Sequence, residues 1–193
     1  SGDINSEIFV DTAFELNEIG ALSNPIQTEF GWHILKLISK KPVESYEKIK
    51  VDLEQKVQKD SRSENINTNE FKALVKEAYD RTANEVKAQH VLVRFESDQD
   101  SLAAYKKIKE LRSRFVNEDF SSFRLSAHDG KSIFVEDLGY FSAFKMVYNF
   151  ENAAFKTPVG QTSEPFKTQF GYHVVKVLNK RPSKGKVQVA HIM

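Results

Sequence analysis

Residues 154–182 read AFKTPVGQTSEPFKTQFGYHVVKVLNKRP, and residues 13–42 read AFELNEIGALSNPIQTEFGWHILKLISKKP. The two stretches align along their whole length once one residue is left out before the glycine of the later copy. Such a repeat sets the domain organisation, because each copy belongs to one structural unit. Identical pairs include Gly20/Gly160, Ser23/Ser163, Pro25/Pro165, Thr28/Thr168, Gly31/Gly171 and His33/His173.

A second, shorter repeat agrees with the first. Residues 87–92 read KAQHVL and residues 188–193 read QVAHIM, so that His90 and His191 correspond. We therefore expect each unit to open on one histidine-bearing strand and to close on another.

The composition is that of an ordinary globular protein, and it excludes several kinds of site. The chain is 40% hydrophobic and 28% charged with a formal net charge of +1, so nothing indicates a nucleic-acid surface. No apolar run is long enough to span a bilayer. The chain has no cysteine, which excludes disulfides, thiolate metal sites and cysteine nucleophiles. Metal-site spacings and phosphate-binding loops are also absent, so we expect no metal and no cofactor.

Hydrophobic periodicity predicts both helices and strands. The expected helices are 5–16, 45–59, 69–84, 101–116, 119–127 and 147–155, and the expected strands are 24–28, 31–39, 86–94, 133–141, 164–167, 172–179 and 186–193. Their order within 86–182 predicts a compact α+β domain with helices packed on a small sheet. Residues 60–69 are polar and turn-rich, which is typical of a linker. The charged faces of the helices on either side of it are expected to be solvated.

Motifs of the complete unit resemble those of parvulin-type peptidyl-prolyl cis–trans isomerases. They are AQHVL at 88–92, DLGYF at 137–141, ENAAF at 151–155 with a methionine five residues earlier, and GQTSEPFKTQFGYH at 160–173. The resemblance covers 86–182. Residues 1–42 resemble only the second half of such a domain, 186–193 resemble its first strand, and 43–85 form a helical linker region. This layout is similar to that of tandem-domain periplasmic SurA-type folding factors, which assist outer-membrane proteins.

The resemblance implies a site that acts on X–Pro peptide bonds. Twisting such a bond crosses a barrier of ~20 kcal/mol without making or breaking a bond, so an apolar slot and polar groups suffice. In the family, the imidazoles that match His90 and His173 form a hydrogen-bonded pair, and a threonine that matches Thr168 supports one of them. The matches to the proline slot are Met146, Phe150 and Phe170, with Tyr140 or Phe141 closing its side.

One segment departs from the family pattern. Members usually carry Asp or Cys before the DLG motif, close to the first histidine, whereas residues 125–133 read LSAHDGKSI. Depending on the gap, His128 or Asp129 falls near that position, and Glu136 replaces a usual glycine. The departure predicts weak rather than strong isomerase activity.

The leading interpretation is a prolyl isomerase and folding factor of the bacterial cell envelope, located in the periplasm. Its expected partners are proline-containing unfolded polypeptides, such as outer-membrane protein precursors. The alternative is a non-catalytic chaperone that binds aromatic-rich unfolded segments, and a third possibility is an architectural spacer domain.

The order of the units is unusual, because the chain starts inside one unit and ends at the start of another. Three explanations are open: an excerpt of a longer array, a rearrangement in which 66–193 naturally precede 1–65, or the loss of residues between the present C- and N-termini.

An unpaired strand is a hazard, and the last strand of the chain has no partner inside the complete unit. We predict that Val187–Met193 pairs with Trp32–Ser39, in the same chain or by strand exchange with a neighbouring one, bringing His191 near His33. This half-site is not expected to catalyse. Asn5 stands where Met146 stands in the complete unit, which leaves only Phe9 for the slot.

Overall fold

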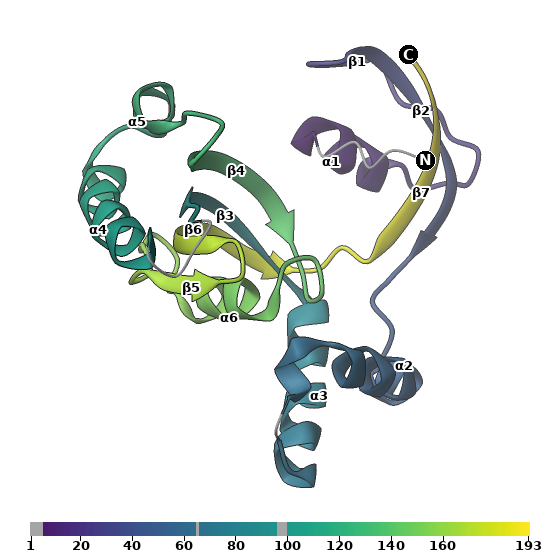
Figure 1. Cartoon of the computed structure of the whole chain (residues 1–193). Coiled ribbons are helices and arrows are strands. Elements are labelled where there is room, and N and C mark those ends of the chain that lie inside the picture. Colours follow the sequence, from purple (N-terminus) through teal and green to yellow (C-terminus); the bar gives the residue numbers. More distant parts are fainter. Residues whose placement is uncertain (1–5, 65, 96–99) are drawn as a thin grey trace. The chain divides into compact units, whose positions relative to one another are not determined.

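The computed structural model describes residues 6–64, 66–95 and 100–193 (Figure 1). The chain separates into two compact units. The smaller one comprises Ser1–Lys48 together with Ser183–Met193, and the larger one comprises Ile49–Pro182. Both combine helices with an antiparallel sheet, so the predicted α+β class is confirmed.

The larger unit is built on a four-stranded antiparallel sheet in the order β4-β3-β6-β5. The strands are β3 (Asn84–Val93), β4 (Ile133–Phe141), β5 (Phe166–Thr168) and β6 (Gly171–Pro182). The helices are α2 (Tyr46–Lys59), which begins just before the unit boundary, α3 (Thr68–Thr82), α4 (Ser101–Asn117), α5 (Phe120–Ala127) and α6 (Tyr148–Lys156), with a 3-10 turn η1 (Ser61–Ser63). The predicted helices are all present, with ends displaced by at most two residues.

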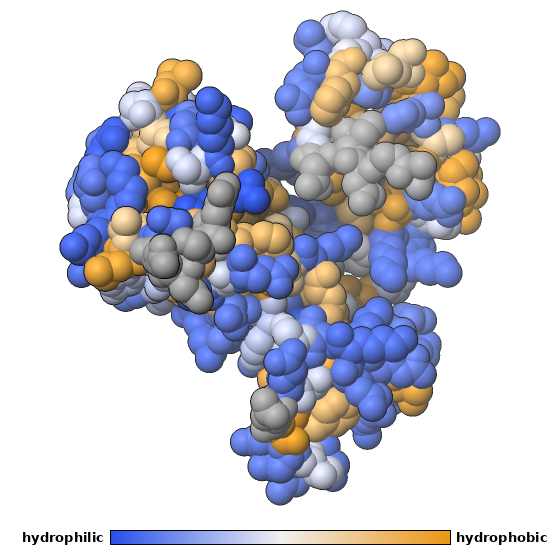
Figure 2. Space-filling model, viewed as in Figure 1, coloured by the Kyte–Doolittle hydropathy of each residue, from blue (hydrophilic) through white to orange (hydrophobic). Residues whose placement is uncertain are grey.

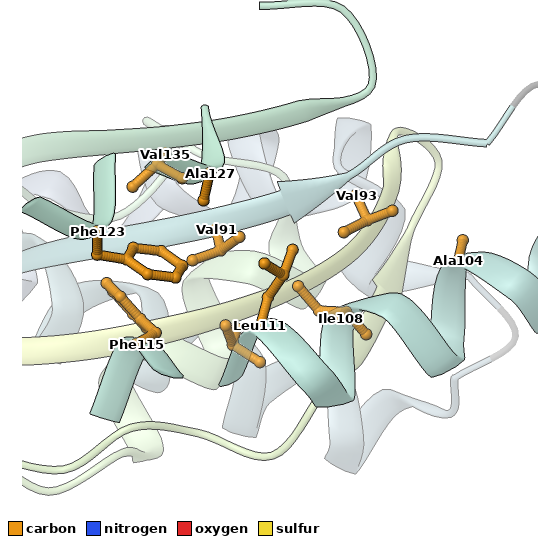
Figure 3. Packing of buried hydrophobic residues seen from close by; sticks show 10 residues of the cluster. Val91, Val93, Ala104, Ile108, Leu111, Phe115, Phe123, Ala127 and Val135 are labelled. Carbon is orange, nitrogen blue, oxygen red and sulfur yellow. The ribbon is translucent and has the colours of Figure 1, made fainter. Parts of the chain in front are cut away.

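The two faces of this sheet carry different clusters, because successive residues of a strand point to opposite faces. One face packs against α4 and α5, and Figure 3 shows Ile108, Leu111 and Phe115 of α4 pointing toward the strands. The buried residues of this cluster are Val91, Val93, Val135 and Val174 of the sheet with Ala104, Ile108, Leu111, Phe115, Phe123 and Ala127 of the helices. The other face carries Ala88, Val175 and Val177 against α6. His90 and His173, which neighbour Val91 and Val174 in sequence, therefore point to the α6 face.

The smaller unit is a three-stranded antiparallel sheet in the order β1-β2-β7 with one helix. Its elements are α1 (Glu7–Glu15), β1 (Ile26–Thr28), β2 (Gly31–Lys41) and β7 (Lys186–Ile192). The ladder between β2 and β7 runs from Ile34↔Ile192 to Lys41↔Lys186. The predicted pairing of the last strand is therefore confirmed, and it occurs within one chain. Trp32 and Met193, which the prediction included, lie outside the ladder.

One face of the smaller sheet is covered by α1 and the other carries exposed apolar side chains. Phe9, Ala13 and Leu35 form the buried cluster beneath α1. Trp32 and Ile192 alternate with residues that face α1, and they are 61% and 75% exposed. Hydrophobic residues are visible on the surface of this unit in Figure 2, whereas hydrophilic residues dominate the visible face of α2 and α3. The corresponding face of the larger sheet is covered by α4 and α5.

Identical residues of the long repeat make identical contacts in the two units. The Leu35 amide donates to Ser23 Oγ at 2.9 Å, and the Val175 amide donates to Ser163 Oγ at 3.0 Å. These serines fasten the loop before each closing hairpin to its long strand. The repeat in sequence is therefore a repeat in structure.

Candidate functional site

The two histidines of the larger unit lie side by side on the α6 face of the sheet. His90 is on β3 and His173 is on the adjacent β6, and both side chains are buried. Their rings are inclined by only 17°, with centroids 5.8 Å apart. Phe150 of α6 meets both rings edge-on, at 5.4 Å from each centroid. One aromatic side chain from the covering helix thus closes over two stacked imidazoles.

The hairpin of β5 and β6 fixes the orientation of His173. Thr168 Oγ1 lies 2.8 Å from His173 Nε2, and the Phe170 amide donates to the same oxygen at 3.1 Å. Phe166 stacks on the His173 ring with a centroid distance of 5.5 Å and an inclination of 14°. The ring is therefore held by a hydrogen bond at one edge and by Phe166 on one face.

Glu136 on β4 is the hydrogen-bond partner of the other histidine. It is the cross-strand neighbour of His90, and its Oε2 lies 2.9 Å from His90 Nε2. An ionised carboxylate only accepts hydrogen bonds, so the neutral His90 ring carries its hydrogen on Nε2 and leaves Nδ1 as an acceptor. Glu136 was not among the predicted site residues. The sequence did show that Glu136 replaces a glycine that is usual in the family. Only the register of β3 and β4, however, brings Glu136 next to His90.

The imidazoles do not form the hydrogen-bonded pair that the family resemblance implied. Within the described residues, the buried Nδ1 atoms of His90 and His173 have no hydrogen-bond partner. Each ring is instead turned so that its Nε2 reaches a separate partner, Glu136 or Thr168, and the rings stack. The two Nδ1 atoms are consequently the buried polar atoms of the site that have no partner among the described residues.

Both imidazoles are neutral at pH 7. Burial, and then the neighbouring His90, lowers the pKa of His173 to about 3. Burial also lowers the pKa of His90, and this outweighs the opposite effect of Glu136. Burial disfavours the charged form of an imidazole because the protonated ring loses its hydration. The floor of the site is thus aromatic, with hydrogen-bonding atoms and uncharged rings.

Apolar residues surround Phe150, which the sequence assigned to the proline slot. Phe141 is buried with its ring centroid 6.2 Å from that of Phe150, and Met146 packs against the same cluster. Phe170 is 46% exposed and contributes its backbone amide to Thr168. Of the two candidates for the side of the slot, Phe141 is the one beside Phe150. Tyr140 lies under the guanidinium of Arg181, at 3.5 Å from its ring centroid.

The structure does not bring His128 or Asp129 to His90. His128 Nδ1 accepts from the Val135 amide at 3.0 Å, and Val135 belongs to the cluster on the opposite face of the sheet. Asp129 accepts from the Ser132 hydroxyl and from the backbone amides of residues 131–133, and these hydrogen bonds hold the pKa of its carboxyl well below the usual range. The expectation for these two residues is therefore corrected, because the carboxylate beside His90 is Glu136.

The smaller unit repeats the arrangement. His33 on β2 and His191 on β7 have ring centroids 5.4 Å apart, and Phe9 of α1 meets them edge-on at 5.6 and 5.5 Å. Thr28 Oγ1 lies 2.8 Å from His33 Nε2. His191 thus lies near His33 as predicted. The comparison of Asn5 with Met146 falls outside the described residues.

Two other kinds of feature are missing from the described part of the chain. It holds no group of three or more His, Cys, Asp or Glu residues that could bind a metal ion. It also holds no helix that is long and apolar enough to cross a membrane.

Comparisons with known proteins match both units. A family model of the PPIC-type PPIase domain matches residues 56–181, and a second model with this description matches residues 1–39. The chain is 38% identical over 113 residues to the foldase protein PrsA of Geobacillus kaustophilus, covering 57% of this chain and 37% of that protein. It is 29% identical over 177 residues to the chaperone SurA of Nitrosococcus oceani, covering 90% of this chain and 33% of that protein.

A solved structure adds a smaller relative. The chain is 36% identical to NmPin, the parvulin of Nitrosopumilus maritimus, covering 50% of this chain and 97% of that one with a TM-score of 0.31. By contrast, the chain spans only about a third of the length of the PrsA and SurA relatives.

Proposed function

Because the chain belongs to the PPIC-type peptidyl-prolyl isomerase domain family, we propose that its larger unit binds X–Pro segments of unfolded polypeptides and accelerates their cis–trans isomerisation. The observation that carries this proposal is the pair of buried, neutral imidazoles of His90 and His173 beneath Phe150. Phe150, Phe141 and Met146 supply the apolar wall for the pyrrolidine ring.

The chemistry requires a change of surroundings and no covalent step. A planar amide is stabilised by resonance, which places partial negative charge on its oxygen and which water reinforces. An apolar slot removes that hydration and so reduces the free-energy difference between the planar and the twisted amide. Twisting also leaves a lone pair on the prolyl nitrogen, and fixed polar groups that suit the twisted form lower the barrier. That lone pair needs a donor, so the candidate for this role is His173 Nδ1, in the tautomer whose Nε2 accepts from Thr168 Oγ1. The Nδ1 of His90 is an acceptor and does not suit it.

We further propose substrates and a location for this chain. We assign to this chain unfolded client proteins, including outer-membrane protein precursors, in the bacterial periplasm or cell envelope. The relatives named foldase and chaperone support this assignment. We also propose that 86–182 is a complete parvulin-like domain, that 43–85 is a helical linker region, and that 1–42 is the C-terminal half of a further parvulin-like unit whose first strand is 186–193.

A non-catalytic chaperone is the second candidate function. The observation in its favour is the smaller unit, whose sheet exposes Trp32, Ile34 and Ile192 on the face that α4 and α5 cover in the larger unit. Exposed apolar residues of this kind suit contacts with unfolded, aromatic-rich segments. Asp129 is held within its own loop, and the carboxylate beside His90 is Glu136, at a position where the family usually has glycine. Because of this departure from the family pattern, we expect weak catalysis.

The test is the isomerisation rate of an Xaa-Pro tetrapeptide with catalytic amounts of the whole chain. We expect acceleration by the wild type, its loss in His173→Ala, and its retention in His33→Ala, which makes the matched change in the smaller unit. Equal activity of His173→Ala and the wild type would exclude the proposed site. A wild type that suppresses client aggregation without any acceleration would favour the chaperone function.

A further inference from the structure

A buried carboxylate follows Phe150 in the sequence. The side chain of Glu151 has no exposed surface, and it has four hydrogen-bond donors. Its Oε1 accepts from Arg62 Nη1 at 3.2 Å and from Arg81 Nη1 at 3.0 Å. Its Oε2 accepts from Arg62 Nη2 at 3.0 Å and from the Phe144 amide at 2.8 Å. A buried charge is tolerated only when it is paired in this way, so Glu151 depends on its arginines.

Both arginines come from the helical region that precedes the sheet. Arg62 lies in η1, and its side chain is completely buried. Asp60 orients it by accepting from Arg62 Nε at 3.0 Å, and its guanidinium carbon lies 4.3 and 4.6 Å from the ring centroids of Phe144 and Tyr148. Arg81 belongs to the last turn of α3. Two residues outside 86–182 therefore neutralise a carboxylate inside it.

The cluster fixes the loop between β4 and α6. Phe144 has a φ of 63°, a left-handed conformation that is unfavourable for a bulky residue, and its amide is held by Glu151. The preceding amide, that of Ala143, donates to the Arg81 carbonyl at 3.0 Å. Met146 lies in the same loop, and α6, which bears Phe150, begins directly after it. Both slot residues are thus placed from the cluster around Glu151.

We propose that Arg62 is a positioning residue for the proline slot, acting through Glu151 on the 142–147 loop and on α6. The slot then has its binding geometry only while the turn of residues 60–62 is docked, so a movement of this turn would change substrate binding. This inference rests on the proposed function and adds to it a turn whose position affects substrate binding. Lysine could not replace Arg62, because the two oxygens of Glu151 are met by the two terminal nitrogens of a planar fork.

Methionine signals offer a direct test. The chain has two methionines, Met146 in the slot loop and Met193 at the C-terminus, so methyl-labelled protein gives one reporter and one internal reference in NMR spectra. In Arg62→Leu we expect the Met146 methyl signal to shift while that of Met193 stays in place. We also expect KM for a proline tetrapeptide to rise about 10-fold, by displacement of slot residues. The change in kcat should be smaller, because contacts with the pyrrolidine ring, unlike the removal of water from the amide, are the same in the ground state and the transition state.

The matched control removes an arginine elsewhere in the larger unit. Arg114 pairs with Glu118 on the surface of α4, at 2.7 Å. Arg114→Leu should leave both methionine signals and KM unchanged. A merely structural role of Arg62 would reduce the active fraction, which lowers kcat and leaves KM as it is.

Two results would overturn the inference. One is an unmoved Met146 signal with unchanged KM in a folded Arg62→Leu. Should that variant not fold, Asp60→Asn loosens only the turn and is expected to shift the Met146 signal in the same direction by less. The second overturning result is an unmoved Met146 signal in Asp60→Asn. If the wild type shows no turnover, the proposed function fails separately. The shift of the Met146 signal and the Kd of the peptide then still test whether Arg62 positions the slot.

Discussion

The buried ring of His173 makes the stability of the larger unit depend on pH. Its pKa is about 3 in the folded protein, against the ordinary imidazole value of 6.5 in the unfolded chain. Between these values the unfolded chain binds a proton that the native ring does not bind. The contribution of this ring to stability is therefore complete above pH 6.5 and is lost as the pH falls toward 3.

The size of the effect follows from the two pKa values. At pH 5 the unfolded imidazole is almost fully protonated, whereas the native ring is almost fully neutral. Linkage then removes about 2 kcal/mol from the free energy of unfolding between pH 8 and pH 5 through this one ring. Because domains are stable by about 5–15 kcal/mol in total, such a loss is measurable.

The assay is urea unfolding at pH 8 and pH 5, followed by NMR signals of the larger unit. We expect the free energy of unfolding to fall between pH 8 and pH 5 by about 2 kcal/mol less in His173→Gln than in the wild type. Val177→Ala is the control, because it changes a buried residue of the same strand that does not titrate, and it should lower stability equally at both pH values. The reasoning is refuted if His173→Gln keeps the full pH difference, or if the His173 ring titrates with a midpoint above pH 5.

Three further changes test other contacts. Glu136→Gln should lower the pKa of His90 further, because the carboxylate favours the protonated ring, and an unchanged ring titration by NMR would contradict the role of this pair. Gly171→Ala should lower the free energy of unfolding by about 2–4 kcal/mol, since the glycine has a φ of +146° and a Cβ would lie 2.2 Å from a carbonyl oxygen of β3; wild-type stability would refute it. In Gly185→Ala a Cβ would lie 2.2 Å from a carbonyl oxygen of β2, so amide exchange should quicken in β7 and not in β3, and equal exchange in both variant and wild type would speak against the clash.

Much of the fold and of the site could be predicted from the sequence, because the relevant signals are local. The repeat marks the closing hairpins. Period-two alternation places His90 and Val91 on opposite faces of the sheet, and it does the same for His173 and Val174. The family motifs then bring the two histidines, Thr168 and Phe150 together. The strand pairing of the C-terminal segment followed from the same counting of units.

The remaining features depend on long-range contacts that leave no local pattern. Glu136 reaches His90 through the register of β3 and β4, whereas the sequence before the DLG motif pointed to His128 or Asp129. The polar composition of 60–69 indicated a linker, yet Arg62 within it is buried. The expectation of a solvated charged face on α3 was wrong at Arg81, which is 5% exposed. Both arginines are held by Glu151, 89 and 70 residues away in sequence.

The central claim is that the His90 and His173 pair of the larger unit receives proline. The most direct measurement is a titration of the whole chain with an Xaa-Pro tetrapeptide and with the same peptide carrying alanine in place of proline, observed at the histidine ring signals and the Met146 methyl group. The account predicts that the proline peptide shifts the signals of His90, His173 and Met146, and that the alanine peptide does not. Equal shifts by both peptides, or shifts confined to His33 and His191, would contradict it.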